Sequence, residues 1–322
     1  MVERHAPSAK TFIRSARGSV TNSRKLNPKT PNPSDFVTIG LVVLTALLIG
    51  LNYTVMKSAL DHTSPLALAA LRATVGAPFL WVVAIARRER LPSTRQQWLA
   101  VWWISLSITT ISSGFLVLAI SRLSPGLSAM LSATMPLFTA IIAVALLAER
   151  PGRRGYTGLF IGLLGAVFIA IPALGSGNTT LGIVFSLISG ISWALGAVLN
   201  KRLPAALEIS PLMLVTCQIS LSALCLHAVV PIIETWSDTD LSWGLVVPLL
   251  YASIPSLAIT FVLFATVLRR APAIQGAAVA YLTPFFGVVF GWFLLGDRFS
   301  LVELCGGGLV IGGVAVLSTD PR

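Results

Sequence analysis

Long apolar stretches follow one another along this chain and constrain its fold more than any other feature. Most have about the 20 residues that an α-helix needs to cross the hydrocarbon core of a bilayer. Short breaks rich in Pro, Gly or charged residues separate them, as is typical of turns. Ten such segments can be assigned, at 36–57, 66–86, 97–120, 126–148, 156–173, 181–200, 211–233, 243–268, 274–295 and 301–318. The sequence therefore predicts an all-α polytopic membrane protein with ten transmembrane helices.

Composition and charge exclude an ordinary soluble enzyme and argue against nucleic-acid binding. Only 11% of the residues are charged and the mean hydropathy is +0.84, whereas soluble domains are about 25% charged. The chain has a net charge of +11, and its basic residues are unevenly distributed. Nineteen of the 23 Lys and Arg residues fall in the two termini and in alternate loops, on one side of the predicted spans. The positive-inside rule places that side, with both termini, in the cytoplasm.

The first 35 residues have a different character from the rest. They contain seven Lys or Arg and four Pro among many Ser, Thr and Asn residues, and such a mixture cannot bury enough apolar surface to fold. We expect residues 1–35 to form a disordered basic cytoplasmic tail that touches anionic lipid. An organelle transit peptide would have a similar composition.

An internal repeat relates the two halves of the chain. An offset of 148 residues places 122–165 over 270–313 without a gap, and it matches two prolines, two acid–arginine pairs and several glycines. The halves, 36–173 and 181–318, each hold five predicted helices. An odd number of helices makes the second repeat enter the membrane upside down, which is the architecture of carriers that open to either side in turn.

Two equivalent stretches also resemble a known family. They read ISRLSPGLSAMLSATMPLFTAIIAVALLAERPGRRGYTGLFIGLLGAV and VLRRAPAIQGAAVAYLTPFFGVVFGWFLLGDRFSLVELCGGGLVIGGV. Each has a mid-helix Pro, an acid at the helix end and a Gly-rich helix after it, which is similar to the EamA-like domains of the drug/metabolite transporter superfamily. The resemblance implies a bacterial inner-membrane carrier that exports amino acids or related metabolites.

Other functions stay open at this point: uptake of a metabolite, extrusion of cationic drugs, or a membrane sensor or scaffold without transport. No Asp or Glu lies near the middle of a predicted span, and no nucleophile or zinc motif occurs, so we expect neither an enzyme nor a bound metal or cofactor. The expected partners are a small-molecule solute and the lipid bilayer.

Arg72 is a charge placed well inside a predicted span. A charge at that depth is expensive unless it faces water, pairs or snorkels. It therefore either reaches the outer surface or anchors a substrate carboxylate, with Gln218 as its neutral counterpart in the second half.

Polar and aromatic residues interrupt the first helix of each half and are candidate substrate contacts. Such groups either bond to neighbouring helices or line a wet cavity. They are Asn52, Tyr53, Ser192, Trp193 and Asn200.

Pro136 and Pro284 are predicted helix breaks at equivalent positions in the two halves. Paired breaks in inverted repeats point to a central binding site, so the nearby Ser132, Thr134, Tyr281 and Thr283 are further candidate contacts. The alternative is that both prolines only bend their helices.

Two further features are structural or functional candidates. Glu149 and Asp297 are either helix-end acids that accept backbone hydrogen bonds or parts of a gate.

The motifs Gly158-x-x-x-Gly162 and Gly308-x-x-x-Gly312 let helix backbones approach closely. We expect these fifth and tenth helices to form a scaffold between the halves or the face of a homodimer.

Overall fold

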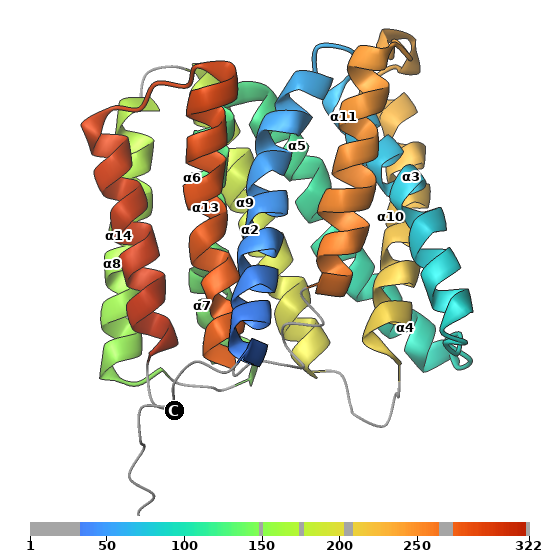
Figure 1. Ribbon diagram of the computed structural model, residues 1–322, viewed down its shortest axis with the longest axis horizontal. Coiled ribbons are helices and arrows are strands. Elements are labelled where there is room, and N and C mark those ends of the chain that lie inside the picture. The colour runs from blue at the N-terminus through green and yellow to red at the C-terminus, as the bar shows by residue number, and fades with distance from the viewer. Residues whose placement is uncertain (1–32, 148–150, 174–176, 203–208, 264–272, 320–322) are drawn as a thin grey trace, which may run out of the picture. The chain divides into compact units, whose positions relative to one another are not determined.

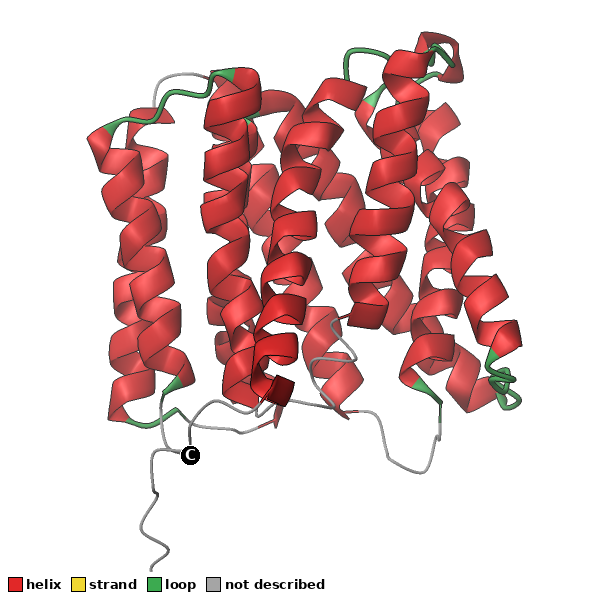
Figure 2. Cartoon of the chain, in the orientation of Figure 1, coloured by secondary structure: helices red, strands yellow, loops and turns green. Residues whose placement is uncertain are grey.

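The computed structural model describes residues 33–147, 151–173, 177–202, 209–263 and 273–319. Within these ranges the chain is helical and contains no strand (Figure 2). The chain divides into two units, Met1–Val37 and Thr38–Arg322, and the packing described below is that of the second. The predicted tail, residues 1–35, lies almost entirely outside the described residues.

The helices follow the predicted segments (Figure 1). The first half contains α2 (Pro33–Ala59), α3 (Pro65–Ala86), α4 (Arg95–Ile104), the π-helical turn η1 (Ser105–Ile111), α5 (Ser112–Arg122), α6 (Pro125–Ser132), α7 (Met135–Leu147), α8 (Arg153–Ala170) and η2 (Ile171–Ala173). The second half contains α9 (Gly177–Arg202), α10 (Pro211–Ile233), η4 (Trp236–Asp238), α11 (Trp243–Ser253), the π-helical turn η5 (Ile254–Ile259), α13 (Ala273–Leu295) and α14 (Leu301–Ser318).

Helix length and hydropathy confirm the class of polytopic membrane protein. Within the described ranges, eight helical stretches are long and apolar enough to cross a membrane, and Leu282–Leu295 is a shorter apolar helix. Helix α8 is not one of the eight. It begins with Arg153 and Arg154, and two charges in so short a helix lower its mean hydropathy.

Ser-Pro pairs begin several of these helices. Helices α3, α6 and α10 each have a Ser at the N-cap and Pro at the first helical turn. Proline suits that position because its φ is already helical and the missing N–H would have had no helical partner. The Ser124 and Ser210 side chains accept hydrogen bonds from the backbone N–H groups of Leu127 and Met213. The local sequence therefore sets where these helices start.

Equivalent helices of the two halves pack against each other in opposite directions. The pairs are α3 with α10, α6 with α13, and α8 with α14. The start of α3 lies beside the end of α10, since the backbone N–H of Leu66 donates to the Glu234 carboxylate. The start of α6 lies beside the end of α13 in the same way, through Gly126 and Asp297. An inverted repeat produces this arrangement.

Helices α8 and α14 lie side by side (Figure 1) and touch through glycines. A Cβ atom added to Gly158 would lie 2.6 Å from the carbonyl oxygen of Gly313, and one added to Gly165 would lie 2.6 Å from that of Gly306. Side chains larger than hydrogen are therefore excluded from this interface. The glycine-rich helices join the two halves, as one of the two expectations for them required.

The second glycine motif does not take part in this contact. A Cβ atom added to Gly308 or Gly312 would meet nothing within 4 Å. For this pair the scaffold alternative is wrong, because α14 turns its Gly306 and Gly313 face toward α8 instead. The homodimer alternative stays a prediction. Helical periodicity places Gly308 and Gly312 on another face.

The two mid-helix prolines behave differently. Helix α6 ends at Ser132 and α7 begins at Met135, so the chain is interrupted just before Pro136. Helix α13 continues through Pro284 without an interruption, and the expected break at Pro284 is wrong. A proline removes one hydrogen bond and can bend a helix without ending it when the neighbouring turns are packed.

The α8–α14 contact predicts a large difference between two neighbouring glycines. Replacing Gly313 with Leu should lower the thermal unfolding temperature of the detergent-purified protein clearly, because overpacking a tight contact costs roughly 1–3 kcal/mol or more. Gly312→Leu is the matched control and should unfold near the wild-type temperature. Equal losses for both variants would contradict the assigned interface.

Candidate functional site

Arg72 lies inside the helix bundle. It projects from α3, is only 9% exposed, and its Nε donates a 3.0 Å hydrogen bond to the carbonyl oxygen of Ala252 in α11. The side chain is thus held by protein backbone between α3 and α11. This placement differs from the snorkelling alternative, in which the guanidinium reaches for the bilayer surface.

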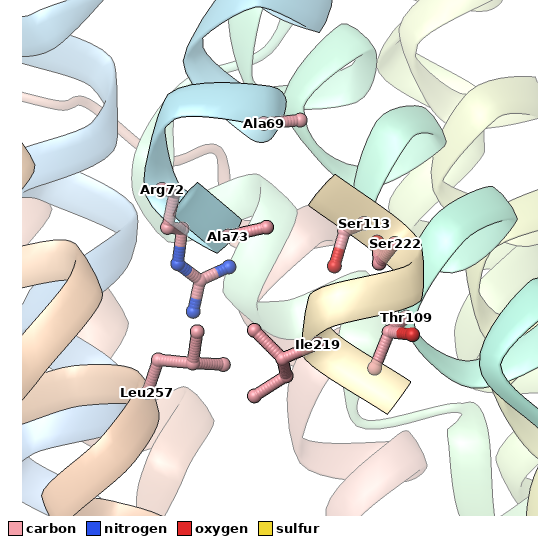
Figure 3. Close-up of a pocket in the computed structure, with 8 residues that line it drawn as sticks. All are labelled: Ala69, Arg72, Ala73, Thr109, Ser113, Ile219, Ser222 and Leu257. Atoms are coloured by element: carbon pink, nitrogen blue, oxygen red, sulfur yellow. The ribbon is translucent and has the colours of Figure 1, made fainter. Parts of the chain in front are cut away.

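The guanidinium lines a small pocket between the two halves of the chain. Figure 3 shows the residues that surround it, which come from α3, η1, α5, α10 and η5: Ala69, Arg72, Ala73, Thr109, Ser113, Ile219, Ser222 and Leu257. The pocket has room for little more than a water molecule. It combines one cation, three hydroxyls and small or apolar side chains.

Two of the three hydroxyls have hydrogen-bonding capacity left. Thr109 donates a 2.8 Å hydrogen bond to the carbonyl oxygen of Ser105. The Ser113 and Ser222 hydroxyls make no hydrogen bond to another described residue. Hydroxyl groups in an apolar interior are normally paired. Four other buried hydroxyls among the described residues also lack a partner, but they do not line the pocket: Thr54, Ser64, Thr110 and Ser128.

Lys57 provides a contrast to Arg72. Its ammonium group in α2 donates to the carbonyl oxygens of Ile120, Ser121 and Leu123, at 2.8, 3.1 and 3.0 Å. A lysine has three donors, so all of them are used at the C-terminal end of α5, where a helix dipole favours a cation. Lys57 is a structural cation with no donor left for a ligand.

A π-helical turn flanks the pocket from each half. Thr109 belongs to η1 and Leu257 to η5, and the two turns lie in the third helix of each half at an offset close to that of the repeat. The hydroxyl of Thr260, which directly follows η5, donates to the carbonyl oxygen of Pro255, five residues earlier, at 2.9 Å. Such turns are rare and often occur at functional sites.

Two predicted contacts in the first helix, Asn52 and Tyr53, are buried. Tyr53 is 5% exposed. The Asn52 amide donates to the sulfur of Met56 at 3.0 Å, and its buried Oδ1 has no hydrogen-bond partner. Both side chains therefore lie in the protein interior.

The hydroxyls beside the prolines bond to backbone carbonyls a few residues earlier in the chain. Ser132, Thr134 and Thr283 donate to backbone carbonyls three or four residues earlier, at 2.7, 2.6 and 2.8 Å. All three are buried. The Tyr281 side chain lies outside the described residues. In this conformation the three described hydroxyls are occupied by the backbone.

The predicted contacts in α9 do not converge on the Arg72 pocket. The Ser192 hydroxyl donates to the carbonyl oxygen of Ser107 in η1 at 2.9 Å. Trp193 and Asn200 lie on exposed faces of the helix. Gln218, the counterpart of Arg72, is buried, and its backbone carbonyl accepts a 2.7 Å hydrogen bond from the Ser105 hydroxyl.

Two carboxylates bond to the start of a helix in the other half. Glu234, which follows α10, accepts from the backbone N–H groups of Leu66 and Ala67 at 2.8 and 3.3 Å. Asp297 accepts from the N–H of Gly126 at 3.0 Å. Both act where a helix dipole favours an anion. Glu149, the repeat partner of Asp297, lies outside the described residues.

The α2–α3 and α10–α11 loops add further contacts between the halves. The Thr63 and Thr239 hydroxyls are 2.8 Å apart, and the backbone N–H of Asp240 donates to the carbonyl oxygen of His62 at 2.8 Å. We call these loop contacts, together with those of Glu234 and Asp297, the cross-repeat latch. It joins the two halves at the end of the bundle where α3 and α6 begin.

Sequence reasoning missed Ser113, Ser222 and Glu234. A signal existed for the first two, because hydroxyl residues crowd the otherwise apolar stretch 105–113 and recur at 220 and 222. Glu234 directly follows a predicted helix, and nothing in the local sequence indicates its contact with the other half. Among the described residues, no group of three or more His, Cys, Asp or Glu side chains is placed to hold a metal ion.

Comparison with known proteins shows similarity to membrane transporters along most of the chain. The "Uncharacterized transporter YvbV" of Bacillus subtilis (strain 168) is 23% identical over 88% of this chain and 92% of its own length. The "Probable amino-acid metabolite efflux pump" of Salmonella typhimurium is 25% identical over 86% of this chain and 93% of its own length. A protein solved by crystallography shares the fold, with a TM-score of 0.60 and 20% identity over 88% of this chain and 97% of that one.

The family match covers both halves. Residues 37–171 and 180–319 each match the EamA-like transporter family, as the paired stretches around Pro136 and Pro284 indicated. This chain belongs to the EamA-like transporter family.

Proposed function

We propose that this protein is a secondary transporter of the bacterial inner membrane that exports amino acids or related small metabolites by alternating access. The observation that carries the substrate class is the similarity, over 86% of the chain, to a relative named as a probable amino-acid metabolite efflux pump. The family match over both halves supports transport in preference to enzymatic or scaffolding roles.

Alternating access gives the cross-repeat latch a mechanical role. The two halves pair through equivalent helices running in opposite directions, so one can rock against the other around a central site. The latch closes the end of the bundle where α3 and α6 begin. Opening that end requires the contacts of Glu234 and Asp297, and those between the two loops, to break.

We further propose ten membrane spans with both termini in the cytoplasm. The ten consist of the eight long apolar stretches together with α8 and α13. The positive-inside rule supports the orientation, because Lys and Arg gather in the loops opposite the latch. The latch would then close the outer side of the membrane.

Transport can be tested directly with the purified full chain. Proteoliposomes preloaded with an unlabelled amino acid should take up the same labelled amino acid faster than liposomes without protein, because a carrier exchanges its substrate across the membrane. Cells that overproduce the protein should also survive higher doses of toxic amino-acid analogues. Sensitisation of these cells would indicate uptake in place of export, and absence of exchange for every solute tried would end the carrier proposal.

A reversible cross-link tests the latch. In a variant lacking Cys217, Cys225 and Cys305, cysteines at Thr63 and Thr239 should form a disulfide, because the hydroxyls they replace are 2.8 Å apart. Oxidation should abolish exchange, and a reductant should restore it. Each single-cysteine variant is a control and should transport equally under both conditions. Full transport by the oxidised double variant would contradict opening at this end.

Labelling of single cysteines tests the orientation. A cysteine replacing the exposed Ser237, between α10 and α11, should react with a membrane-impermeant maleimide in spheroplasts. A cysteine replacing the exposed Ser93, before α4, should react only after the membrane is permeabilised. The reverse pattern would show that the latch faces the cytoplasm.

A further inference from the structure

The charge of Arg72 has no anionic partner in the part of the chain that the structure describes. Its one hydrogen bond runs from Nε to the Ala252 carbonyl oxygen, and the one ion pair found there joins His62 to Asp240 in the loops. A buried cation without a counter-charge is strongly unfavourable. A group from outside the chain is therefore well placed to supply the missing negative charge.

Unused donors around the pocket match that requirement. A guanidinium has five N–H donors, and the four on its terminal nitrogens make no hydrogen bond to another described residue. Ser113 and Ser222 face the same pocket with hydroxyls that are likewise unpaired there. Figure 3 shows the guanidinium on one side of the pocket and the two serines on the other.

From this geometry we infer that the Arg72 pocket is a carboxylate subsite, in which Arg72, Ser113 and Ser222 bind the carboxylate of an amino acid or a related organic acid. The planar guanidinium matches two carboxylate oxygens at once, and the serine hydroxyls donate from the facing helices. The inference rests on the proposed function and names the group that its substrate must carry.

The remaining lining of the pocket suits an organic acid. Ala69 and Ala73 flank Arg72 on α3 and leave space beside it, while Ile219 and Leu257 add apolar surface. The carboxylate of such a ligand would contact Arg72, and its apolar remainder would contact Ile219 and Leu257. The pocket is too small for a whole amino acid in this conformation, so occupancy requires the helices to move apart.

Occupancy would also link the two halves of the protein. Arg72 and Ser113 belong to the first half, whereas Ser222 and Leu257 belong to the second. A carboxylate held by Arg72 and Ser222 together would bridge them, and a π-helical turn on each side gives the third helices a place to deform. Binding at this position can therefore change how the two halves move relative to each other.

The test compares amino acids with analogues that lack the charge. Thermal unfolding of the detergent-purified full chain is measured with L-leucine and L-phenylalanine, with their amides, and with 4-methylpentanoate, which keeps the carboxylate of leucine without its amine. At least one carboxylate should stabilise the protein, and the matching amide should bind about 10-fold more weakly or worse.

Variants then assign the binding to the pocket. Arg72→Gln should weaken carboxylate binding by about 10-fold to 100-fold, and Ser113→Ala or Ser222→Ala by about 2-fold to 10-fold. The exposed Arg87, at the end of α3, offers a matched control, and Arg87→Gln should bind as the wild type does. If Arg72→Gln fails to fold, the test uses the serine variants and Arg72→Lys. The lysine keeps the positive charge but lacks the planar guanidinium that can donate to two carboxylate oxygens at once.

The outcomes separate this subsite from the carrier function. If no carboxylate in the panel binds, or if Arg72→Gln or the serine variants leave the affinity unchanged, the subsite is wrong, whatever proteoliposomes transport. Exchange of a solute without a carboxylate would also overturn the subsite and leave the carrier standing. Carboxylate binding that depends on Arg72, without exchange of any solute, would keep the subsite and remove the carrier proposal.

Discussion

Every polar group inside a bilayer must find its partner within the protein, because hydrocarbon offers none. The arrangement of this chain follows from that constraint. Lys57 donates to three carbonyl oxygens at the end of α5, and hydroxyls beside Pro136 bond to carbonyls a few residues earlier in the chain. Carboxylates from one half satisfy the free N–H groups at the start of helices in the other.

Arg72, Ser113 and Ser222 depart from this pattern around one pocket. The other buried side-chain atoms without a partner in the described interior, such as Asn52 Oδ1 and the Thr54 and Ser128 hydroxyls, do not line it. The departure is informative because a buried cation and two hydroxyls with unused hydrogen-bonding capacity line the same pocket. Sites that bind ligands must leave some groups unsatisfied until the ligand arrives, and natural proteins break the usual packing rules mainly at such sites. The same reasoning distinguishes Arg72 from Lys57, because the donors of Lys57 are all used by backbone carbonyls and most of those of Arg72 are not. In the sequence alone the two residues are simply the two cations inside predicted spans.

The interface between the two repeats contains two kinds of contact, close helix packing and hydrogen bonds that can open. Helices α8 and α14 meet through glycines, which bring backbone against backbone and suit a permanent joint. The latch instead consists of hydrogen bonds from Glu234, Asp297 and loop residues, which can be exchanged for water when that end opens. A carrier needs both, since one part must hold while another moves.

The sequence by itself determined the features that depend on local pattern. Apolar length and the internal repeat predicted the helical segments and the membrane class, and the resemblance of two stretches predicted the family. The interruption before Pro136 was also predictable, because proline acts on its own helix.

Only the tertiary structure decided which of those residues meet. It turned Gly306 and Gly313 toward α8 but not Gly308 and Gly312, and it kept α13 intact through Pro284. It also brought Ser113 and Ser222 to Arg72 from helices far apart in sequence. The physical reason is that composition and period identify the faces of a helix, whereas the choice of neighbour depends on how side chains from distant segments fit together.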